Sequence, residues 1–284
     1  MLIRRGPKKW SCVWGWDRVG DKFQPGQCVK GYLEANRSTL SPCGKWFSYQ
    51  VMRERMTDSG YFQAMPYSAV SRTPWLKALA FWDRGGVALL RKTGDELQLD
   101  VSPYIGNLAP DTTHESWDAA RIHLVPREHP WGYPIANGGI EFNKWLAEGW
   151  VARTPWEVCS EEECRGVASW STPTDVHRIH FEKRVIGTHW TLRMSSWCGC
   201  HNDKGNKEAH RGVHFETFAL VSGLGTVLSF PAWTSADHDA FRNRIVWTQA
   251  QQLWAMDLLR NELGAPAMLL DLTGKEGWRT EAPY

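Results

Sequence analysis

The residues best suited to chemistry are a group of cysteines and histidines between positions 198 and 214. Zinc takes four nitrogen or sulfur ligands in a tetrahedron, so this group could supply a complete zinc site. The Cys-x-Cys spacing is shorter than the usual spacing of about two to four residues, and nearby lysines and an arginine add positive charge. We therefore expect a polar loop and no cofactor, with zinc as the possible metal, and keep a metal-dependent hydrolase as the alternative. Its candidate metal ligands are Cys198, Cys200, His201, His210 and His214.

Three further histidines stand in polar surroundings. His177 and His180 are three residues apart in an alternating stretch, so on a strand they point to opposite faces and cannot easily share a ligand. We expect His177 to be exposed and His180 to be half-buried. His238 lies between Asp237 and Asp239, in what we expect to be a turn, where aspartate commonly bonds its own backbone. A catalytic carboxylate–imidazole pair is the less favoured interpretation there.

Common catalytic and nucleotide-binding motifs are missing from the sequence. It has no Gly-x-Ser-x-Gly elbow, no P-loop, no glycine-rich dinucleotide loop and no His-Glu-x-x-His. This absence leaves enzyme activity open but favours a non-enzymatic protein.

Composition and charge limit the classes of partner that we expect for this chain. The chain has 284 residues and a formal net charge of +2, too balanced to indicate a nucleic-acid groove. No apolar run is long enough for a transmembrane helix, so we expect no membrane partner. The basic N-terminus lacks the apolar region of a signal peptide. We therefore expect a cytoplasmic protein whose seven cysteines are mostly reduced.

Short alternating runs rich in aromatic and β-branched residues, separated by turn residues, dominate the chain and predict strands. Residues 45–51 follow a Ser-Pro-Cys-Gly turn, and residues 177–186 and 189–195 form a hairpin candidate around Gly187-Thr188. Further strands are predicted at 214–221, 227–230, 244–249 and 252–258. Only Thr248 to Leu263 competes for a helix, because it lacks internal glycine and proline. We favour strands there, and a single all-β domain over residues 1–284.

Two segments carry a resemblance to a known family. Residues 40–49 read LSPCGKWFSY, and residues 230–258 contain the phrases FPAW, RIVW and QLWAMDL. Both resemble blades of TolB-like or WD-repeat β-propellers, with Cys43 where aspartate is usual. Trp82-Asp83 and Trp117-Asp118 resemble the WD dipeptide. The chain also looks like a group of bacterial proteins that share an SPDG…Y strand, an AVSRxPxLxAL segment (residues 69–79 here) and a final APY.

This resemblance implies an irregular β-propeller-like repeat of short antiparallel sheets. At about 40–50 residues per blade, the length allows six or seven blades. Propellers bind ligands through loops, so the resemblance implies a protein-binding or scaffold module of the bacterial cytoplasm, with another protein as partner. A β-sandwich-like fold is the structural alternative. The candidate contact residues lie in expected loops and are Arg72, Trp82, Asp83, His129, Trp131, Asp237, His238 and Asp239.

The 18 tryptophans are the compositional outlier. Most fall within or beside the alternating runs, where large aromatics fill the space between packed sheets. Four lie in expected loops. Because exposed tryptophans can bind sugars, a glycan-binding protein is the second alternative function. These four are Trp14, Trp16, Trp131 and Trp197.

Overall fold

The computed structural model describes most of the chain, and it divides into two compact units. The first unit comprises Met1–Lys144 with Gly274–Tyr284, and the second comprises Trp145–Thr273. The prediction of one domain over residues 1–284 stays a prediction. The described residues are 1–5, 10–56, 62–82, 88–93, 96–101, 122–126, 144–146, 148–153, 157–158, 176–199, 214–259, 262–275, 278 and 280–283.

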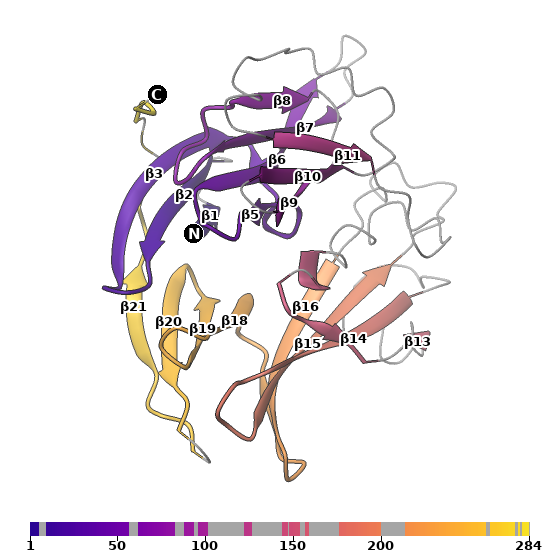
Figure 1. Cartoon of the computed structure of the whole chain (residues 1–284), viewed down its shortest axis with the longest axis vertical. Coiled ribbons are helices and arrows are strands. Elements are labelled where there is room, and N and C mark those ends of the chain that lie inside the picture. Colours follow the sequence, from indigo (N-terminus) through magenta and orange to yellow (C-terminus); the bar gives the residue numbers. More distant parts are fainter. Residues whose placement is uncertain are drawn as a thin grey trace. The chain divides into compact units, whose positions relative to one another are not determined.

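In the first unit, the strands form three small sheets (Figure 1). The first is antiparallel, in the order β1-β2-β3. The second is antiparallel, in the order β4-β6-β7-β8, with β5 also paired to β6. In the third, β10 pairs antiparallel with β9 and parallel with β11. The bounds are β1 (Leu2–Arg5), β2 (Trp10–Asp17), β3 (Lys22–Lys30), β4 (Tyr32–Leu33), the 3-10 turn η2 (Ala35–Arg37), β5 (Thr39–Leu40), β6 (Trp46–Met56), β7 (Phe62–Arg72), β8 (Ala80–Trp82), β9 (Ala88–Thr93), β10 (Glu96–Val101) and β11 (Ile122–Pro126).

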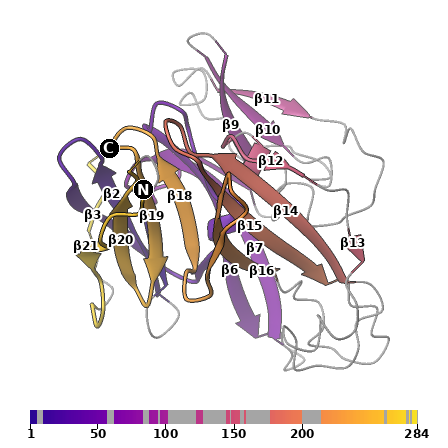
Figure 2. The same ribbon diagram turned by 90° about the horizontal axis from the view of Figure 1, so that it is seen from below.

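The second unit contains two antiparallel sheets. One has the order β12-β14-β15-β16-β17, with β13 also paired to β14, and the other is the four-stranded meander β18-β19-β20-β21 (Figure 2). A four-stranded meander is the usual form of a propeller blade. The bounds are β12 (Val151–Ala152), β13 (Glu157–Val158), β14 (Val176–Arg184), β15 (Trp190–Gly199), β16 (His214–Ser222), β17 (Val227–Phe230), β18 (Ser235–Asp239), β19 (Arg244–Gln249), β20 (Gln252–Asp257) and β21 (Ala267–Asp271).

The predicted fold class is confirmed at the level of all-β structure built from small antiparallel sheets. Sheets of three to six strands whose members lie close together in the sequence are typical of β-propellers. The described residues form five sheets, so a count of six or seven blades is not confirmed. Among these residues, no helix has the length and apolar character needed to cross a bilayer.

Local sequence explains why the helix alternative fails at Thr248 to Leu263. Ala250 and Gln251 adopt positive φ angles of 49° and 66° and form the tight turn between β19 and β20. This turn brings Trp247 opposite Trp254, and their rings stack with centroids 6.3 Å apart. The cross-strand aromatic contact therefore outweighs the helix propensity of the intervening residues.

The core of the first unit lies between its two antiparallel sheets. Fully buried side chains come from β2, β4, β6 and β7, and Phe47 stacks on Tyr49 with ring centroids 5.2 Å apart. The hydroxyl of Tyr49 donates a hydrogen bond to the Leu76 carbonyl at 2.6 Å, so its polar atom is satisfied. The cluster consists of Val13, Leu33, Phe47, Tyr49, Val51 and Ala69.

A disulfide joins Cys12 of β2 to Cys28 of β3. The two residues are directly opposite in the register of this strand pair. The expectation of reduced thiols is therefore wrong for these two cysteines. The sequence argument failed because the pairing depends on the register of two strands and not on a local motif. Among the cysteines whose side chains the structure describes, Cys43 is free, and it is exposed.

Gly26 of β3 meets the backbone of Pro74 closely. A Cβ added at Gly26 would overlap the carbonyl oxygen of Pro74 and lie 2.9 Å from its Cβ. The same carbonyl accepts a hydrogen bond from the amide of Gln27 at 3.2 Å, so the loop after β7 cannot easily move away.

We expect Gly26→Ala to lower the free energy of unfolding by about 1–3 kcal/mol, the usual cost of overpacking. Urea denaturation of the two proteins measures this difference. Gly20→Ala is the matched control, because a Cβ there would meet side-chain atoms only at 3.4 Å. Equal stability of the Gly26→Ala variant and the control would contradict the close contact.

Candidate functional site

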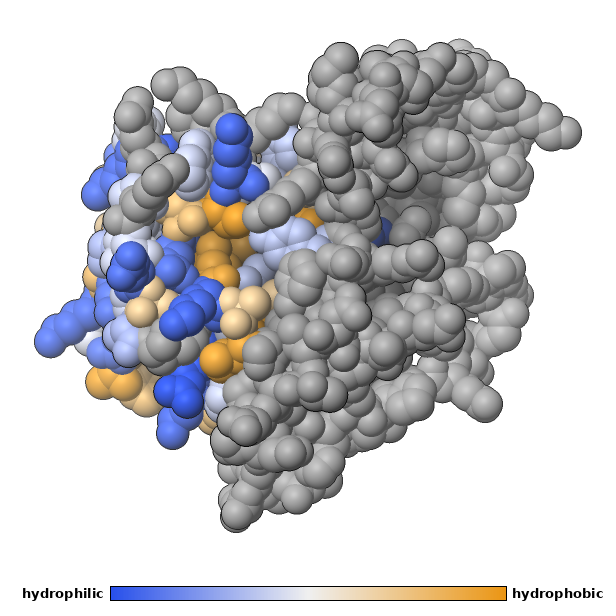
Figure 3. Space-filling model, turned by 90° about the horizontal axis from the view of Figure 1, so that it is seen from above, coloured by the Kyte–Doolittle hydropathy of each residue, from blue (hydrophilic) through white to orange (hydrophobic). Residues whose placement is uncertain are grey.

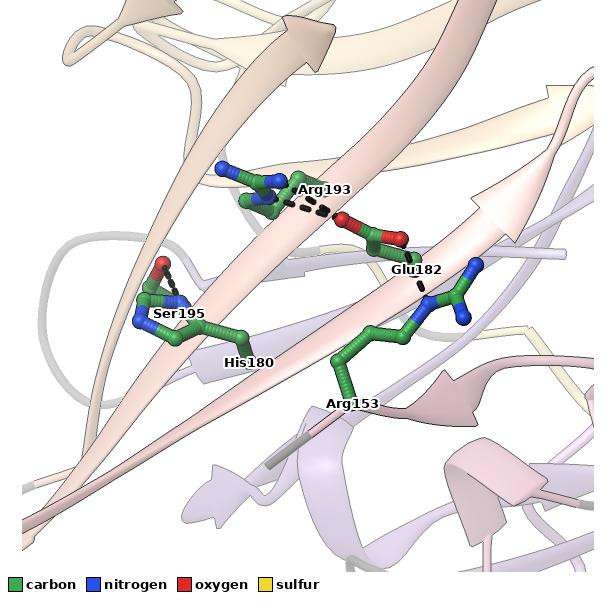
Figure 4. Close-up of polar contacts among 5 residues, drawn as sticks. All are labelled: Arg153, His180, Glu182, Arg193 and Ser195. Carbon is green, nitrogen blue, oxygen red and sulfur yellow. Dashed lines mark hydrogen bonds and ion pairs between the residues drawn. The ribbon is translucent and has the colours of Figure 1, made fainter. Parts of the chain in front are cut away.

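Two polar pairs lie on one face of the hairpin formed by β14 and β15. Glu182 is directly opposite Arg193, and His180 is directly opposite Ser195. Because alternate residues of a strand point to the same side, both pairs share one face of the sheet. Figure 4 shows Glu182 between two arginines and the His180 ring turned toward Ser195. We call this group the arginine face: Arg153, His180, Glu182, Arg193 and Ser195.

The carboxylate of Glu182 holds two guanidinium groups. Its Oε1 accepts hydrogen bonds from Nε and Nη2 of Arg193 at 3.0 and 2.7 Å. Its Oε2 accepts one from Nε of Arg153 at 2.7 Å. The backbone helps to place Arg153, which follows β12, because its amide donates to the carbonyl of His180 at 3.0 Å.

Exposure differs across the three charged side chains. The side chain of Glu182 is 14% exposed, that of Arg193 is 35% exposed and that of Arg153 is 63% exposed. The carboxylate therefore lies beneath the two cations, which face solvent. Two guanidinium groups against one carboxylate leave the cluster with net positive charge.

The electrostatics keep Glu182 ionised. Burial acts to raise the pKa of this carboxyl, but the hydrogen bonds and charges of Arg193 and Arg153 outweigh burial and lower the pKa. A carboxylate in this state is a poor proton donor at neutral pH. Its role here is to orient the arginines.

His180 and Ser195 form a hydroxyl–imidazole pair. Nδ1 of His180 lies 2.7 Å from Oγ of Ser195. A serine nucleophile also needs a group that orients its base, and the carboxylate of Glu182 bonds the two arginines and not His180. The pair therefore lacks the Glu182 contact that would complete a Ser–His–Glu arrangement.

The arrangement is suited to binding an anion. A guanidinium carries five N–H donors in a rigid fork, and Glu182 engages only part of each fork. The remaining donors of two pre-oriented arginines can bind carboxylate or phosphate oxygens. Neighbouring hydroxyl and imidazole groups extend the polar surface.

Protonation of Glu182 is expected to weaken this cluster. Because the folded-state pKa is lowered, the stabilisation is present above the unfolded value of about 4.3 and is lost as the pH falls through the folded value. We expect Glu182→Gln to cost about 1 kcal/mol or less, since the arginines are partly exposed. The difference from the unmodified chain should shrink on acidification, as measured by urea unfolding over a pH series. In an Arg153→Gln/Arg193→Gln background this pH dependence should be lost or reversed, because burial alone raises the pKa of Glu182. Its persistence there with the same sign would contradict the assignment.

The predicted contact residues that the structure describes belong to two different units. Arg72 is exposed at the end of β7 in the first unit, where its guanidinium lies over the Trp46 ring, 5.6 Å from the centroid. Trp82 ends β8 and pairs with Ser68. Asp83, His129 and Trp131 lie outside the described residues. The other three candidates, at positions 237–239, belong to the second unit.

The turn predicted at Asp237, His238 and Asp239 is wrong, because these residues form the end of β18. The turn begins one residue later, at 240–243. Asp237 accepts a hydrogen bond from Lys183 of β14 at 2.6 Å, and Asp239 is buried against Arg244. His238 is buried, with Nε2 3.3 Å from Oδ1 of Asn243. These contacts link strands, which explains why the aspartates are not in a loop.

The candidate metal ligands are only partly described. Cys198 is in β15 and His214 is in β16, and they are directly opposite in the register. Cys200, His201 and His210 lie outside the described residues. Among the residues whose side chains the structure describes, no group of three potential ligands surrounds a common point.

The tryptophans expected in loops are mostly in strands. Trp14 and Trp16 belong to β2, and Trp197 belongs to β15. Trp14 is buried and packs edge-to-face on Trp278 at 5.1 Å, while Trp16 stacks on Phe23 at 5.8 Å. Trp14 therefore serves packing, and Trp16 is half-buried and stacked on Phe23. Trp131 lies outside the described residues.

Aromatic packing in the second unit follows the same principle. The rings of Phe230, Trp233, Trp247 and Trp254 stack in succession, with centroid distances of 3.9, 4.7 and 6.3 Å.

Figure 3 shows one face of the molecule, where exposed hydrophobic residues are bordered by hydrophilic ones. A mixed surface of this kind is ordinary for folded proteins.

Four members of the arginine face were not singled out from the sequence, namely Arg153, Glu182, Arg193 and Ser195. For the fifth, His180, the prediction of half-burial is confirmed. The available signal was the pair of alternating phrases, His-x-Glu in the first strand of the predicted hairpin and Arg-x-Ser in the second. Counting through the Gly187-Thr188 turn would have placed these phrases side by side. Arg153 carries no such signal, because β12 reaches β14 from a distant part of the chain.

No family model matches the chain, and no curated protein matches it in sequence.

Proposed function

We propose that this chain is a protein-binding module whose arginine face binds acidic side chains of a protein partner. The observation that carries the proposal is the Arg153–Glu182–Arg193 cluster, in which one carboxylate orients two partly exposed guanidinium groups. Pre-orientation lowers the entropy that the arginines would lose on binding a carboxylate. Arginine is also enriched at protein interfaces.

Nearby apolar groups favour a protein over a nucleic acid. Ile186 and Leu224 are exposed at the turns that end β14 and β16, and the two turns touch through a hydrogen bond from Gly223 N to His189 O at 2.8 Å. Val227 is also exposed. It is directly opposite Val221 of β16, which is directly opposite Thr191 of β15, so Val227 lies on the same face of the sheet as Arg193. Apolar side chains beside arginines suit an acidic peptide with hydrophobic neighbours.

The fold-level part of the proposal is a propeller of the TolB-like or WD-repeat kind, from a bacterial cytoplasmic system. It is supported by the resemblance of residues 40–49 and 230–258 and by the four-stranded meander β18–β21. The sheets of such folds present loops and strand ends for protein contacts. Six or seven blades are proposed on length alone.

The test uses a fluorescent glutamate-rich peptide with interspersed leucines, and measures its binding by anisotropy. We expect salt-sensitive binding that weakens about tenfold or more in Arg153→Gln/Arg193→Gln, because hydrogen bonds between charged groups are worth about 1.5–3 kcal/mol. Lys30→Gln, an exposed lysine of β3 in the first unit, is the control for loss of positive charge.

Three results would overturn the proposal. The first is no binding of the peptide by the unmodified chain. The second is equal weakening by Lys30→Gln, which indicates nonspecific attraction. The third is tighter binding of a single-stranded oligonucleotide of the same length and charge, which would assign the arginines to phosphate recognition.

A further inference from the structure

We propose that the hairpin of β14 and β15 carries a phosphate subsite, formed by Arg184, Thr191 and Arg193, that selects a phosphorylated serine or threonine in the protein partner. The inference rests on the proposed function, because it names the acidic group that the arginine face prefers. Arg184 is the last residue of β14, is exposed, and is directly opposite Thr191 of β15. Arg193 of the arginine face follows two residues later on β15.

The register of the hairpin places the three side chains next to one another. Arg184 is two residues from Glu182 on β14, so alternation puts it on the same face of the sheet as the arginine face. Diagonal neighbours in an antiparallel pair lie about 7–8 Å apart, which is within reach of long side chains. Arg184 and Arg193 are diagonal neighbours, and Thr191 is adjacent to both on this face. Two guanidinium groups and one hydroxyl can therefore bind the same anion.

Both arginines of the subsite keep donors for a ligand. Arg193 uses Nε and Nη2 for Glu182, and its remaining nitrogen points away from the carboxylate (Figure 4). Within the described part of the chain, the guanidinium of Arg184 makes no hydrogen bond or ion pair. Both oxygens of Glu182 are already bonded, one to Arg193 and the other to Arg153. Arg184 is therefore not needed to neutralise Glu182.

The charge of the group fits a doubly charged anion better than a singly charged one. The three arginines at positions 153, 184 and 193 bring three positive charges against the one negative charge of Glu182, which leaves two positive charges. A phosphorylated serine carries a charge of about −1.5 to −2 at neutral pH and offers three strong acceptor oxygens. A glutamate side chain carries one negative charge and offers two acceptor oxygens. Phosphate therefore matches both the charge and the number of donors.

Apolar side chains beside the subsite favour a peptide as the source of the phosphate. The row of Arg184 and Thr191 continues through Val221 of β16 to Val227 of β17, which is exposed. Ile186 follows Arg184 by two residues and is 70% exposed. A free phosphate ion has no apolar part to cover these side chains, and single-stranded nucleic acids stack their bases on aromatic side chains. A phosphorylated peptide with hydrophobic neighbours can use the arginines and the apolar side chains together.

The test compares three fluorescent peptides that differ at one central position of a glutamate- and leucine-containing sequence. This position holds glutamate, serine or phosphoserine, and binding to the purified full chain is measured by anisotropy at one salt concentration. We expect the phosphoserine peptide to bind about tenfold or more tightly than the glutamate peptide, because it gains at least one hydrogen bond between charged groups. We expect Arg184→Gln to remove most of this preference. The ratio of the two affinities is the readout, because a general loss of positive charge weakens both peptides.

Two further variants test the placement of the subsite. Thr191→Val keeps a β-branched side chain and removes the hydroxyl, so we expect it to weaken the phosphoserine peptide by about two- to tenfold. Arg242→Gln is the matched control, because Arg242 is an exposed arginine of the second unit in the turn after β18. This control should leave the ratio of the two affinities unchanged.

Failure of this inference and failure of the proposed function give different results. If the glutamate and phosphoserine peptides bind equally well, or if Arg184→Gln leaves their ratio unchanged, the phosphate subsite is overturned and the binding of acidic peptides stands. If no peptide binds, both proposals are overturned. Displacement of the phosphoserine peptide by an equal concentration of inorganic phosphate would overturn the peptide as the source. Tighter binding of a single-stranded oligonucleotide of the same charge would assign the subsite to nucleic acid instead.

Discussion

Replacing Asp239 by alanine is expected to lower the free energy of unfolding by about 3–5 kcal/mol, the usual cost of removing one partner of a buried ion pair. Asp239 Oδ2 lies 3.0 Å from Nε of Arg244, and the two side chains are 1% and 5% exposed. Removal of the carboxylate takes this ion-pair contact from a guanidinium that stays in the low-dielectric interior. Urea unfolding followed by tryptophan fluorescence measures the loss.

Two controls separate this effect from ordinary loss of a charge. Asp237→Ala removes a carboxylate from the same strand, but its side chain is 49% exposed in its pair with Lys183, so we expect a loss of about 1 kcal/mol or less. The double variant Asp239→Leu/Arg244→Met should be more stable than Asp239→Ala, because no buried charge remains. Similar losses for Asp239→Ala and Asp237→Ala would contradict the interpretation.

Removing the disulfide by Cys12→Ser/Cys28→Ser is expected to cost about 3 kcal/mol, the loop-closure value for a separation of this size. The two cysteines are 16 residues apart in the sequence. Without the cross-link, the unfolded chain gains conformational freedom that the folded hairpin of β2 and β3 does not. The comparison is between the oxidised chain, the chain under reductant and the double variant.

The same change is expected to loosen the C-terminal segment. The amide of Trp278 lies 3.5 Å from Sγ of Cys28, and its indole Nε1 donates to the Gly26 carbonyl at 2.9 Å. Acrylamide quenching of tryptophan fluorescence should therefore increase in the double variant. Cys43→Ser is the control, since its thiol is free. Unchanged stability of the unmodified chain under reductant would show that the disulfide does not contribute.

Much of the secondary structure followed from local pattern. The hairpin of β14 and β15, the strands β16 and β17, and the pair β19 and β20 all match runs of alternating residues separated by turn residues. A period of two residues is a property of the strand itself, so it can be read without knowing the partner. The wrong prediction of a turn at 237–239 also came from local pattern, because aspartate is common in turns. In the structure, Asp237 pairs with Lys183 and Asp239 with Arg244, and both aspartates belong to a strand.

The candidate site could not be predicted in the same way. Glu182 and Arg193 become neighbours through a hairpin, which short-range reasoning can reach, but Arg153 joins them from another strand. A slip of one residue in the ladder between β14 and β15 would move Arg193 and Ser195 to the other face of the sheet. Site prediction therefore required the register and not only the strands.

The sequence by itself determined that this chain is all-β, because alternation and turn chemistry act between near neighbours in the chain. Only the tertiary structure decided that Cys12 bonds Cys28 and that Glu182 orients two arginines. The physical reason is that strand pairing joins residues far apart in the sequence, and the chosen register is set by burial of one face across the whole sheet.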